Sequence, residues 1–337
     1  MKAYEVRQFG IDELTLADRP IPEPKAGEVQ VRLRAASLNY RDVMVVSGTY
    51  NPRMKLPAVP FSDGAGEISA LGEGVTRWAV GDRVCPIFVQ GWLDGEATLE
   101  TSRTALGAGA QWDGVLREYA TFSEDSVVRV PECLSFEEAS TLPCAAVTAW
   151  HALNVSGKLK AGDTVLTLGT GGVSVFALQL AMLAGARVIA TTGSDEKIAR
   201  LRELGADEVI NYRSSKDWDT AVLELTAKRG VDHVVEVGGA GTLARSLKSV
   251  RYGGHVALIG ALSGPGEINP VGVFMKLVRL QGLFVGSRKM FEDLNRALEA
   301  GKVHPVIDRV FDFDEVKEAL KYMESGKHFG KIVVRIQ

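Results

Sequence analysis

A glycine-rich turn, Gly169-Thr170-Gly171-Gly172-Val173-Ser174, lies between an apolar run at 164–168 and an apolar stretch of helical spacing. Glycine lets a chain turn tightly and lets its backbone approach a pyrophosphate. The free amides of the following helix then supply donors and the positive end of the helix dipole. Ser174 replaces the third glycine of the usual G-x-G-x-x-G pattern and is still small enough for close helix packing. The turn predicts a dinucleotide site held by Gly169, Gly171, Gly172 and Val173.

The end of the next strand-like run, RVIATT, bears on which dinucleotide binds. NAD enzymes place an Asp or Glu about 20 residues after the glycines, against the ribose hydroxyls. Here that position is Thr192, followed by Gly193 and Ser194, with Lys197 one turn farther along. Neutral donors and a lysine would bind a 2′-phosphate, whereas an acidic side chain at this position would repel it. The sequence therefore favours NADP(H).

Two further residues belong to the same question. Tyr212 and Arg213 follow the third strand-like run and would add a hydroxyl and a charge to the 2′-phosphate pocket. The alternative is that Lys197 is a solvated helix residue and that Asp195 binds the ribose of NAD.

The elements that must position these residues follow from the pattern after about residue 146. Apolar strand-like runs alternate with amphipathic helical runs, beginning with TVLTLG and VSVFALQLAMLAG. Such units, with nearly continuous apolar strands, predict an α/β fold: a doubly wound domain whose parallel sheet has helices on both faces. A glycine-rich helix start also occurs in other α/β proteins, but the repeated alternation favours dinucleotide binding.

The first 130 or so residues have a different pattern, with short β-type runs such as EVQVRLRAAS and GAGEISALG between Gly, Pro and Asp/Asn turns. They predict an irregular β-barrel or sandwich. The segment 90–113 lacks periodicity and is expected to be a long loop. The residues after 282 are too few to fold alone, so we expect them to return and complete the first domain.

Composition excludes several classes of protein. The 337 residues are enough for about two domains, and 39 Lys and Arg against 42 Asp and Glu give a net charge of −3. Without a block of like charge, no nucleic-acid or membrane partner is expected. Three cysteines without C-x-x-C spacing do not make a disulfide framework. No export signal or membrane span is visible, so the expected location is the cytoplasm.

Taken together, several segments resemble the medium-chain dehydrogenase/reductase superfamily over essentially the whole chain. They are AASLNYRDVMVVSGTY, PFSDGAGEISALGEGVTRWAVGDRV, LPCAAVTAWHAL, AGDTVLTLGTGGVS and the closing GKIVV. The resemblance implies a GroES-like catalytic domain at 1–145, completed by 288–337, and a Rossmann domain at 146–287. It also implies a homodimer, pairing near 277–284.

In zinc-dependent members of the superfamily, a cysteine stands at the position of Asn39, a Gly-His-Glu motif at Phe61-Ser62-Asp63 and a second cysteine at Cys144. Catalytic zinc uses about three protein ligands of thiolate, imidazole or carboxylate type. Only Cys144 remains, Asp63 would be a second ligand, and all five histidines lie after position 150. The segment 90–113 also lacks the four cysteines of the structural zinc lobe. We therefore expect no metal.

The patterns Leu38-Asn39-Tyr40 and Ser47-Gly48-Thr49-Tyr50 resemble the zinc-independent quinone oxidoreductase-like branch, which includes the zeta-crystallin type. Without a Lewis acid, nothing stabilises the alkoxide of an alcohol substrate. Reduction of a quinone, or of a C=C bond conjugated to a carbonyl, needs only a hydride and a proton. Such a reductase is expected; the alternatives are an NAD(P)-dependent alcohol or aldehyde oxidoreductase, or a catalytically weak NADPH-binding protein.

The resemblance also assigns residues around the nicotinamide. It places Asn39 and Tyr40 beside the ring and Thr148 against its other face, although Asn39 would alternatively be a loop amide satisfied by backbone. Tyr50 aligns with a tyrosine regarded as the proton donor of related enoyl reductases, and a phenol of pKa about 10 is protonated at neutral pH. The alternative is that Tyr50 only lines the pocket.

The resemblance also assigns two sets of residues, one that contacts the cofactor and one that lines the substrate pocket. Backbone groups expected to reach the nicotinamide carboxamide belong to Gly260, Ala261, Leu262, Phe284, Val285 and Gly286. The substrate pocket is expected to be lined by Phe61, Phe88 and Trp92, unless these are ordinary core aromatics.

Overall fold

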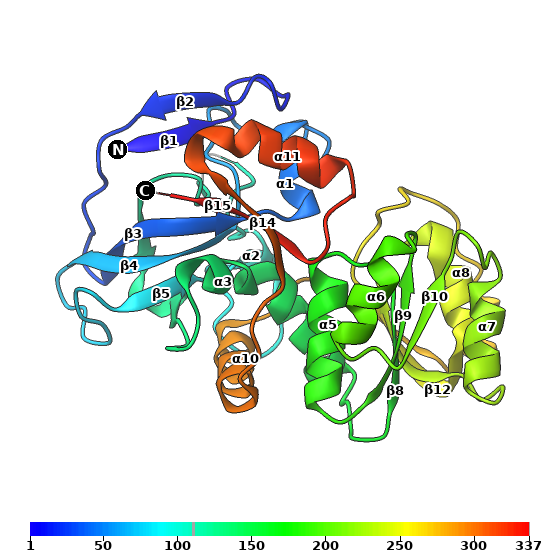
Figure 1. Ribbon diagram of the computed structural model, residues 1–337. Coiled ribbons are helices and arrows are strands. Elements are labelled where there is room, and N and C mark those ends of the chain that lie inside the picture. The colour runs from blue at the N-terminus through cyan, green and yellow to red at the C-terminus, as the bar shows by residue number, and fades with distance from the viewer. Residues whose placement is uncertain (110–111, 337) are drawn as a thin grey trace. The chain divides into compact units, whose positions relative to one another are not determined.

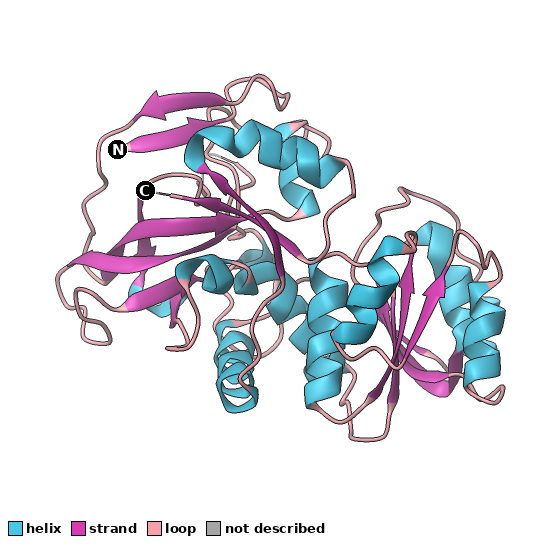
Figure 2. Cartoon of the chain, viewed as in Figure 1, coloured by secondary structure: helices cyan, strands magenta, loops and turns pink. Residues whose placement is uncertain are grey.

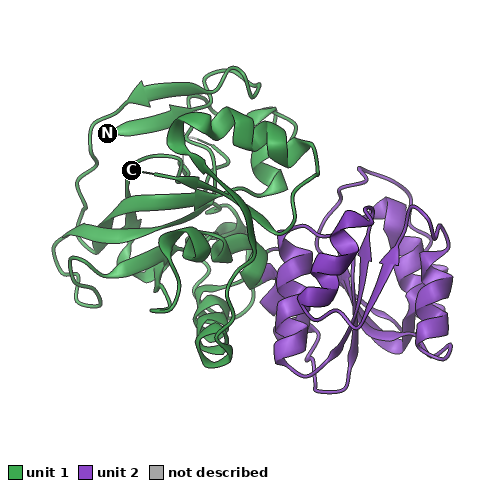
Figure 3. Cartoon of the chain, in the orientation of Figure 1, with its two compact units in different colours: residues 1–147, 285–337 green, residues 148–284 purple. Residues whose placement is uncertain are grey.

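The computed structural model describes residues 1–109 and 112–336, and it divides into two compact units (Figure 3). Unit 1 comprises Met1–Val147 and Val285–Gln337, and unit 2 comprises Thr148–Phe284. The boundaries expected from the sequence, after residues 145 and 287, lie two and three residues from these. Unit 1 is thus assembled from two segments that are separated by all of unit 2.

Unit 2 contains a six-stranded parallel sheet with the strand order β10-β9-β8-β11-β12-β13. The strands are β8 (Thr164–Thr167), β9 (Arg187–Thr192), β10 (Glu208–Asn211), β11 (Val231–Glu236), β12 (Val250–Leu258) and β13 (Arg279–Gly282). The helices are α4 (Val147–Trp150, beginning one residue earlier), α5 (Gly172–Leu183), α6 (Glu196–Glu203), α7 (Trp218–Leu225), α8 (Ala240–Ser249) and α9 (Val271–Met275). A π-helical stretch, His151–Ser156, follows α4. Helices cover both faces of the sheet (Figure 1), so the predicted doubly wound fold is confirmed.

The chain order of this sheet reverses beside β8, because β9 lies on one side of β8 and β11 on the other. Both β8 and β11 are buried along their whole length, although β11 includes the polar residues Asp232, His233 and Glu236. In open sheets of this kind, ligands bind outside the carboxyl ends of the strands at such a reversal. The glycine turn follows β8 and therefore lies at this point.

Unit 1 is rich in strands (Figure 2), as predicted. A seven-stranded sheet has the order β14-β15-β3-β4-β5-β7, with β6 paired to β3, and β1 and β2 form a separate pair. The strands are β1 (Lys2–Glu5), β2 (Thr15–Asp18), β3 (Glu28–Ser37), β4 (Asp63–Leu71), β5 (Arg83–Pro86), β6 (Tyr119–Ser123), β7 (Val127–Arg129), β14 (Ile307–Asp312) and β15 (Lys331–Arg335).

The helices of unit 1 are α1 (Tyr40–Val46), α2 (Leu99–Ser102), α3 (Phe136–Ser140), α10 (Arg288–Gly301) and α11 (Val316–Glu324). Glu124–Ser126 and Phe313–Glu315 are single 3₁₀ turns, and Leu142–Ala146 is π-helical. The segment expected to be a long loop contains only the short α2 and a bridge between Val89 and Ala105; its residues 110–111 lie outside the described residues.

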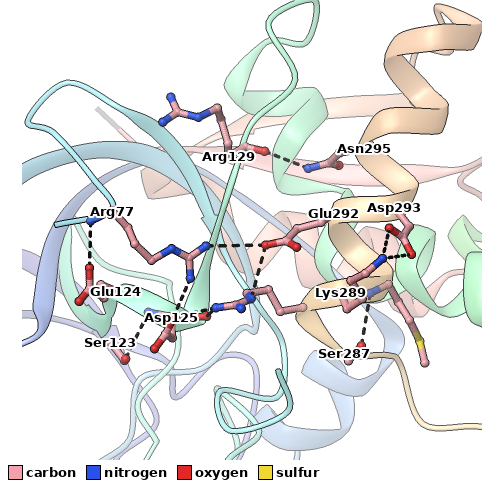
Figure 4. Close-up of polar contacts among 12 residues, drawn as sticks. Arg77, Ser123, Glu124, Asp125, Arg129, Ser287, Lys289, Glu292, Asp293 and Asn295 are labelled. Carbon is pink, nitrogen blue, oxygen red and sulfur yellow. Dashed lines mark hydrogen bonds and ion pairs between the residues drawn. The ribbon is translucent and has the colours of Figure 1, made fainter. Parts of the chain in front are cut away.

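The C-terminal segment completes unit 1, as expected. Strand β15 lies between β14 and β3, and pairs antiparallel with β3 from Val333 opposite Ser37. Helix α10 is held by polar contacts to the 3₁₀ turn before β7 and to the end of β7 (Figure 4). Arg288 donates to Asp125 of the turn at 2.8 Å, and Asn295 donates to the carbonyl of Arg129, the last residue of β7, at 2.9 Å. The C-terminal segment is therefore held in unit 1 by a shared sheet and by these polar contacts.

Among the helices within the described ranges, none combines the length and the apolar character that crossing a bilayer requires.

Candidate active site

The glycine turn of unit 2 leaves open space beside its backbone. Gly169 has φ +74°, a conformation that L side chains rarely adopt, and Gly171 caps the start of α5. A Cβ added at Gly169 or Gly171 would meet no atom within 4 Å among the described residues. A helix start that presents free amides to open space fits a pyrophosphate. The turn therefore fits the nicotinamide dinucleotide expected from the sequence.

Ser174 has a role that its small size alone does not explain. Its hydroxyl is buried and donates to the Leu168 carbonyl at 2.7 Å. This hydrogen bond ties the first turn of α5 to the residue that follows β8. The serine therefore fixes the close approach of helix and strand that a glycine at this position only permits.

The end of β9 carries the neutral groups expected from the sequence. Thr192 is buried, and its hydroxyl accepts the Ser194 amide at 3.2 Å. A Cβ on Gly193 would lie 2.4 Å from the Tyr212 hydroxyl oxygen, so the glycine allows Tyr212 to lie against this turn. The structure thus brings Thr192, Gly193, Ser194 and Tyr212 together.

Two charged side chains near this turn have defined partners. Lys197 Nζ donates to Thr170 Oγ1 at 3.3 Å, which places the ammonium at the glycine turn itself. The Asp195 carboxylate accepts from Asn211 Nδ2 at 2.6 Å. Lys197 therefore reaches back from α6 to the glycine turn, whereas the Asp195 carboxylate is held by Asn211 at the end of β10.

The other predicted cofactor residues divide between the two units. In unit 2, Gly260, Ala261 and Leu262 follow β12 and Phe284 follows β13, so they share the carboxyl edge of the parallel sheet with the glycine turn. Thr148 is buried in α4. In unit 1, Val285 has φ +51°, and a Cβ on Gly286 would lie 2.7 Å from Val147 Cγ1.

Unit 2 also contains a buried carboxylate that the sequence reading did not identify. Glu236 ends β11, and its Oε1 accepts the amides of Gly238 at 2.7 Å and Gly239 at 3.0 Å and the Thr242 hydroxyl at 2.6 Å. Its Oε2 accepts the Ser246 hydroxyl. The carboxylate therefore joins the end of β11 to the first turns of α8.

In unit 1, a guanidinium brings two of the predicted residues together. The Arg41 Cζ lies 4.8 Å from the ring centroids of both Tyr50 and Phe88, within the range of cation–π contacts. Arg41 also donates to the Leu106 carbonyl at 2.9 Å. Tyr50 and Tyr40 remain 40% and 43% exposed, so both phenols are accessible.

The aromatic residues assigned to a substrate pocket are deeply buried. Phe61 is fully buried within the hydrophobic core of unit 1. Trp92 is also buried and donates its indole N–H to the Gly95 carbonyl at 3.0 Å. These positions favour the alternative that Phe61 and Trp92 are core aromatics, while Phe88, although buried, lies against Arg41.

The positions of the zinc ligands in zinc-dependent relatives form a buried polar cluster in unit 1. The Asp63 carboxylate accepts the Ser62 hydroxyl at 2.7 Å and the Cys144 amide at 3.0 Å. Lys331, which the sequence reading did not single out, donates from Nζ to the Asn39 Oδ1 at 2.7 Å and to the Leu38 carbonyl at 2.5 Å. The only signal for Lys331 was its place in the closing GKIVV motif.

These residues do not fit a zinc ion. Among the described residues, no group of three or more His, Cys, Asp and Glu side chains could hold a metal. Burial raises the pKa of the Cys144 thiol, which disfavours the thiolate that a metal binds. Burial also raises the pKa of Asp63, and the Lys331 ammonium is the strongest of the groups that oppose this rise.

Asp42 is a second buried carboxyl at this site. It is fully buried on α1, and its Oδ2 accepts the Asn39 amide at 2.7 Å. Burial raises its pKa to about 7, although the Arg41 charge opposes the rise. Asp42 therefore holds the chain at Asn39, where α1 begins.

Two family models match the chain. One, described as an alcohol dehydrogenase GroES-like domain, matches residues 25–132, and the other, described as a zinc-binding dehydrogenase, matches residues 172–300. Together they span most of both units.

Known proteins are similar over nearly the whole chain. A zinc-type alcohol dehydrogenase-like protein of Schizosaccharomyces pombe is 42% identical over 335 residues, which cover 97% of this chain and 96% of that protein. The quinone oxidoreductase of Homo sapiens is 31% identical over 344 residues, covering 99% and 97%.

Solved structures show the same similarity. A putative alcohol dehydrogenase from Sinorhizobium meliloti has a TM-score of 0.92 at 42% identity, covering 99% of this chain and 98% of that one. A structure described as an NAD-dependent alcohol dehydrogenase has a TM-score of 0.91 at 35% identity, and a mycobacterial protein complexed with NADPH has 0.84 at 27%, each covering both chains completely. The chain is therefore an oxidoreductase that belongs to the medium-chain dehydrogenase/reductase superfamily and is quinone oxidoreductase-like.

Proposed function

We propose that this oxidoreductase uses NADPH to reduce a quinone or an α,β-unsaturated carbonyl compound without a metal. The observation that carries the proposal is the set of groups at the zinc-ligand positions. Asn39 offers an amide bonded to the Lys331 ammonium and Ser62 a hydroxyl bonded to Asp63, so that only Cys144 keeps a ligand of the thiolate and imidazole kind that a metal site needs. Such a site has no Lewis acid to activate an alcohol. Relatives named quinone oxidoreductase support the same substrate class.

The chemistry requires a hydride, an electrophilic carbon and a proton. The bound cofactor supplies the hydride, and the acceptor gains one proton as well. Holding the reacting carbons in contact replaces a bimolecular encounter by a positioned reaction, which is a large part of the expected acceleration. The backbone of Gly169 and Gly171 would hold the pyrophosphate, and Asn39 and Tyr40 would lie beside the nicotinamide.

The test of the proposed function is NADPH oxidation, followed by its absorbance, against a panel of quinones, enones, aldehydes and ketones, with and without a chelator. We expect turnover of quinones or enones that the chelator does not change. Chelator-sensitive alcohol oxidation would instead favour an alcohol dehydrogenase, as some relatives are named. NADPH binding without any turnover would favour a catalytically weak binding protein.

Tyr50→Phe is expected to lower kcat at least about tenfold on the best acceptor while leaving the KM for NADPH within about twofold. The phenol is exposed and held against Arg41, so it can deliver the proton, and general acid catalysis of this kind contributes about a hundredfold or more. Steady-state kinetics give both constants. Tyr252→Phe, which removes the phenol of an exposed tyrosine in β12 of unit 2, is the matched control. An unchanged kcat for Tyr50→Phe would assign Tyr50 to pocket lining only.

Lys197→Ala is expected to raise the KM for NADPH at least about tenfold and to change the KM for NADH little. Lys197 lies in the first turn of α6, directly after the end of β9 where the 2′-phosphate is expected, and no acidic side chain ends β9. A lost charge pair with that phosphate is worth roughly 1.4 kcal/mol or more. Arg202→Ala, on the same helix but exposed, is the control for net charge. Equal effects on both cofactors would contradict the 2′-phosphate assignment and favour the NAD alternative.

We further propose a homodimer that pairs near residues 277–284. Strand β13 is an edge of its sheet, and Phe274, Met275 and Leu277 beside it are large apolar side chains that remain exposed in unit 2. A paired edge would cover them.

The cytoplasm remains the proposed location.

A further inference from the structure

The ammonium of Lys331 is the most deeply buried cation of unit 1 whose role the proposed reaction does not explain. The side chain is 2% exposed, although lysine is rarely buried without a charged or polar partner. Nζ donates to the Leu38 carbonyl and to Asn39 Oδ1. Burial lowers the pKa of this ammonium, and Asp63, Cys144 and Asp42 oppose the shift.

This contact fixes the direction of the Asn39 amide. A lysine ammonium only donates hydrogen bonds, so the Asn39 atom that faces it must be the oxygen. The amide nitrogen, Nδ2, is therefore turned the other way, where it is buried without a hydrogen-bond partner among the described residues. The amide nevertheless lies near enough to Asp63 to lower the pKa of that carboxyl. Asn39 thus lies between a buried ammonium and a buried carboxylate.

The cluster is assembled from distant segments of unit 1. Asn39 precedes α1, Asp63 begins β4, Cys144 lies in the π-helical stretch and Lys331 begins β15. By resemblance, Asn39 and Cys144 stand where zinc-dependent relatives hold the metal. A divalent ion bound there would be repelled by the ammonium at short range, in a site that water screens poorly.

We infer that Lys331 supplies the resident cation of this site in place of a metal: it sets the direction of the Asn39 amide, offsets the charge of Asp63 and excludes a divalent ion. Lys331 is a positioning residue, because it acts through Asn39. The inference rests on the proposed function only for the place of Asn39 beside the nicotinamide. The name zinc-type, carried by similar proteins, therefore does not describe this site.

Metal binding tests the inference without using activity. The wild-type protein, incubated with zinc sulfate and desalted, is expected to retain well under one zinc per chain by elemental analysis. In a parent variant with Asn39→Cys and Ser62→His, which restores a thiolate and an imidazole, adding Lys331→Met is expected to tighten Co²⁺ binding at least about tenfold. The absorbance of the cobalt–thiolate complex gives the affinity.

Lys276 provides the control for loss of a buried ammonium. Lys276, in unit 2, also buries part of its ammonium against backbone carbonyls, donating to Leu247 at 3.0 Å and Lys248 at 2.9 Å. Lys276→Met in the same parent is expected to leave Co²⁺ affinity unchanged. One zinc per chain in the wild type, or equal cobalt affinity with and without Lys331, would overturn the inference. The wild-type measurement stands even where a variant fails to fold.

A double-mutant cycle tests the positioning role. Lys331→Met is expected to lower kcat at saturating NADPH at least about tenfold in the wild-type background, yet less than about twofold in an Asn39→Leu background, because coupled residues give non-additive effects. Additive losses would show that Lys331 does not act through Asn39. If the wild type reduces no acceptor, the proposed function fails, while the metal experiment still decides the inference.

Discussion

Gly171→Asp is expected to weaken NADPH binding at least about 100-fold, equivalent to roughly 2.7 kcal/mol, while the protein stays folded. Gly171 caps α5 with φ −75°, which any residue adopts, and an added Cβ meets no atom within 4 Å. The new side chain therefore costs little in the unliganded protein. Its carboxylate would, however, occupy the open space where the dinucleotide pyrophosphate is proposed to bind, and two anions in that space repel each other.

Titration of NADPH fluorescence measures this loss, and circular dichroism with thermal unfolding checks the fold. Gly171→Asn is the matched control, because it adds nearly the same volume without the charge. The neutral variant is expected to bind NADPH more tightly than the Asp variant. Wild-type affinity in Gly171→Asp would place the pyrophosphate elsewhere and would remove the structural basis of the cofactor proposal.

Glu236→Ala is expected to lower the free energy of unfolding of unit 2 by about 3 kcal/mol or more, because buried donors lose the acceptor that they share. The carboxylate is fully buried and accepts from two backbone amides and two hydroxyls. Alanine would leave these four donors without their acceptor, and each unsatisfied buried donor costs about 1–3 kcal/mol before the structure relaxes.

Urea unfolding followed by circular dichroism measures the change. Glu236→Gln keeps an oxygen for the amides of Gly238 and Gly239, so a smaller loss is expected. Glu208→Ala is the control for removing a glutamate, because its ion pair with Arg187, at 3.7 Å, is exposed and worth about 0–1 kcal/mol. A loss below about 1 kcal/mol in Glu236→Ala would show that water replaces the carboxylate at little cost.

Local patterns in the sequence were enough to predict the doubly wound sheet and its glycine turn. The run that became β8 carries no charged residue because both faces of the strand are buried, and the glycines lie within a few residues of the helix that they begin. Glu236 could have been found in the same way. A glutamate that ends a strand, followed by two glycines and by Thr242 and Ser246 four residues apart, is a local signal.

Lys331 could not have been found from local sequence. Its partner Asn39 is 292 residues away, and only the pairing of β15 with β3 brings the two segments together. A lysine at the start of a strand usually has its charge in solvent. Whether this charge is buried depends on acceptors contributed by segments that no local window contains, so the polar cluster required the tertiary structure.

The position of β15 between β14 and β3 has a consequence for the order of biosynthesis. All of unit 2 leaves the ribosome before the strand that completes the sheet of unit 1, and domains generally fold as units during synthesis. Strand β3 must therefore await a neighbour that is translated almost three hundred residues later. A nascent chain from which Lys331 has not yet emerged is thus expected to lack the contact between Lys331 and Asn39, even when its cofactor-binding unit is already folded.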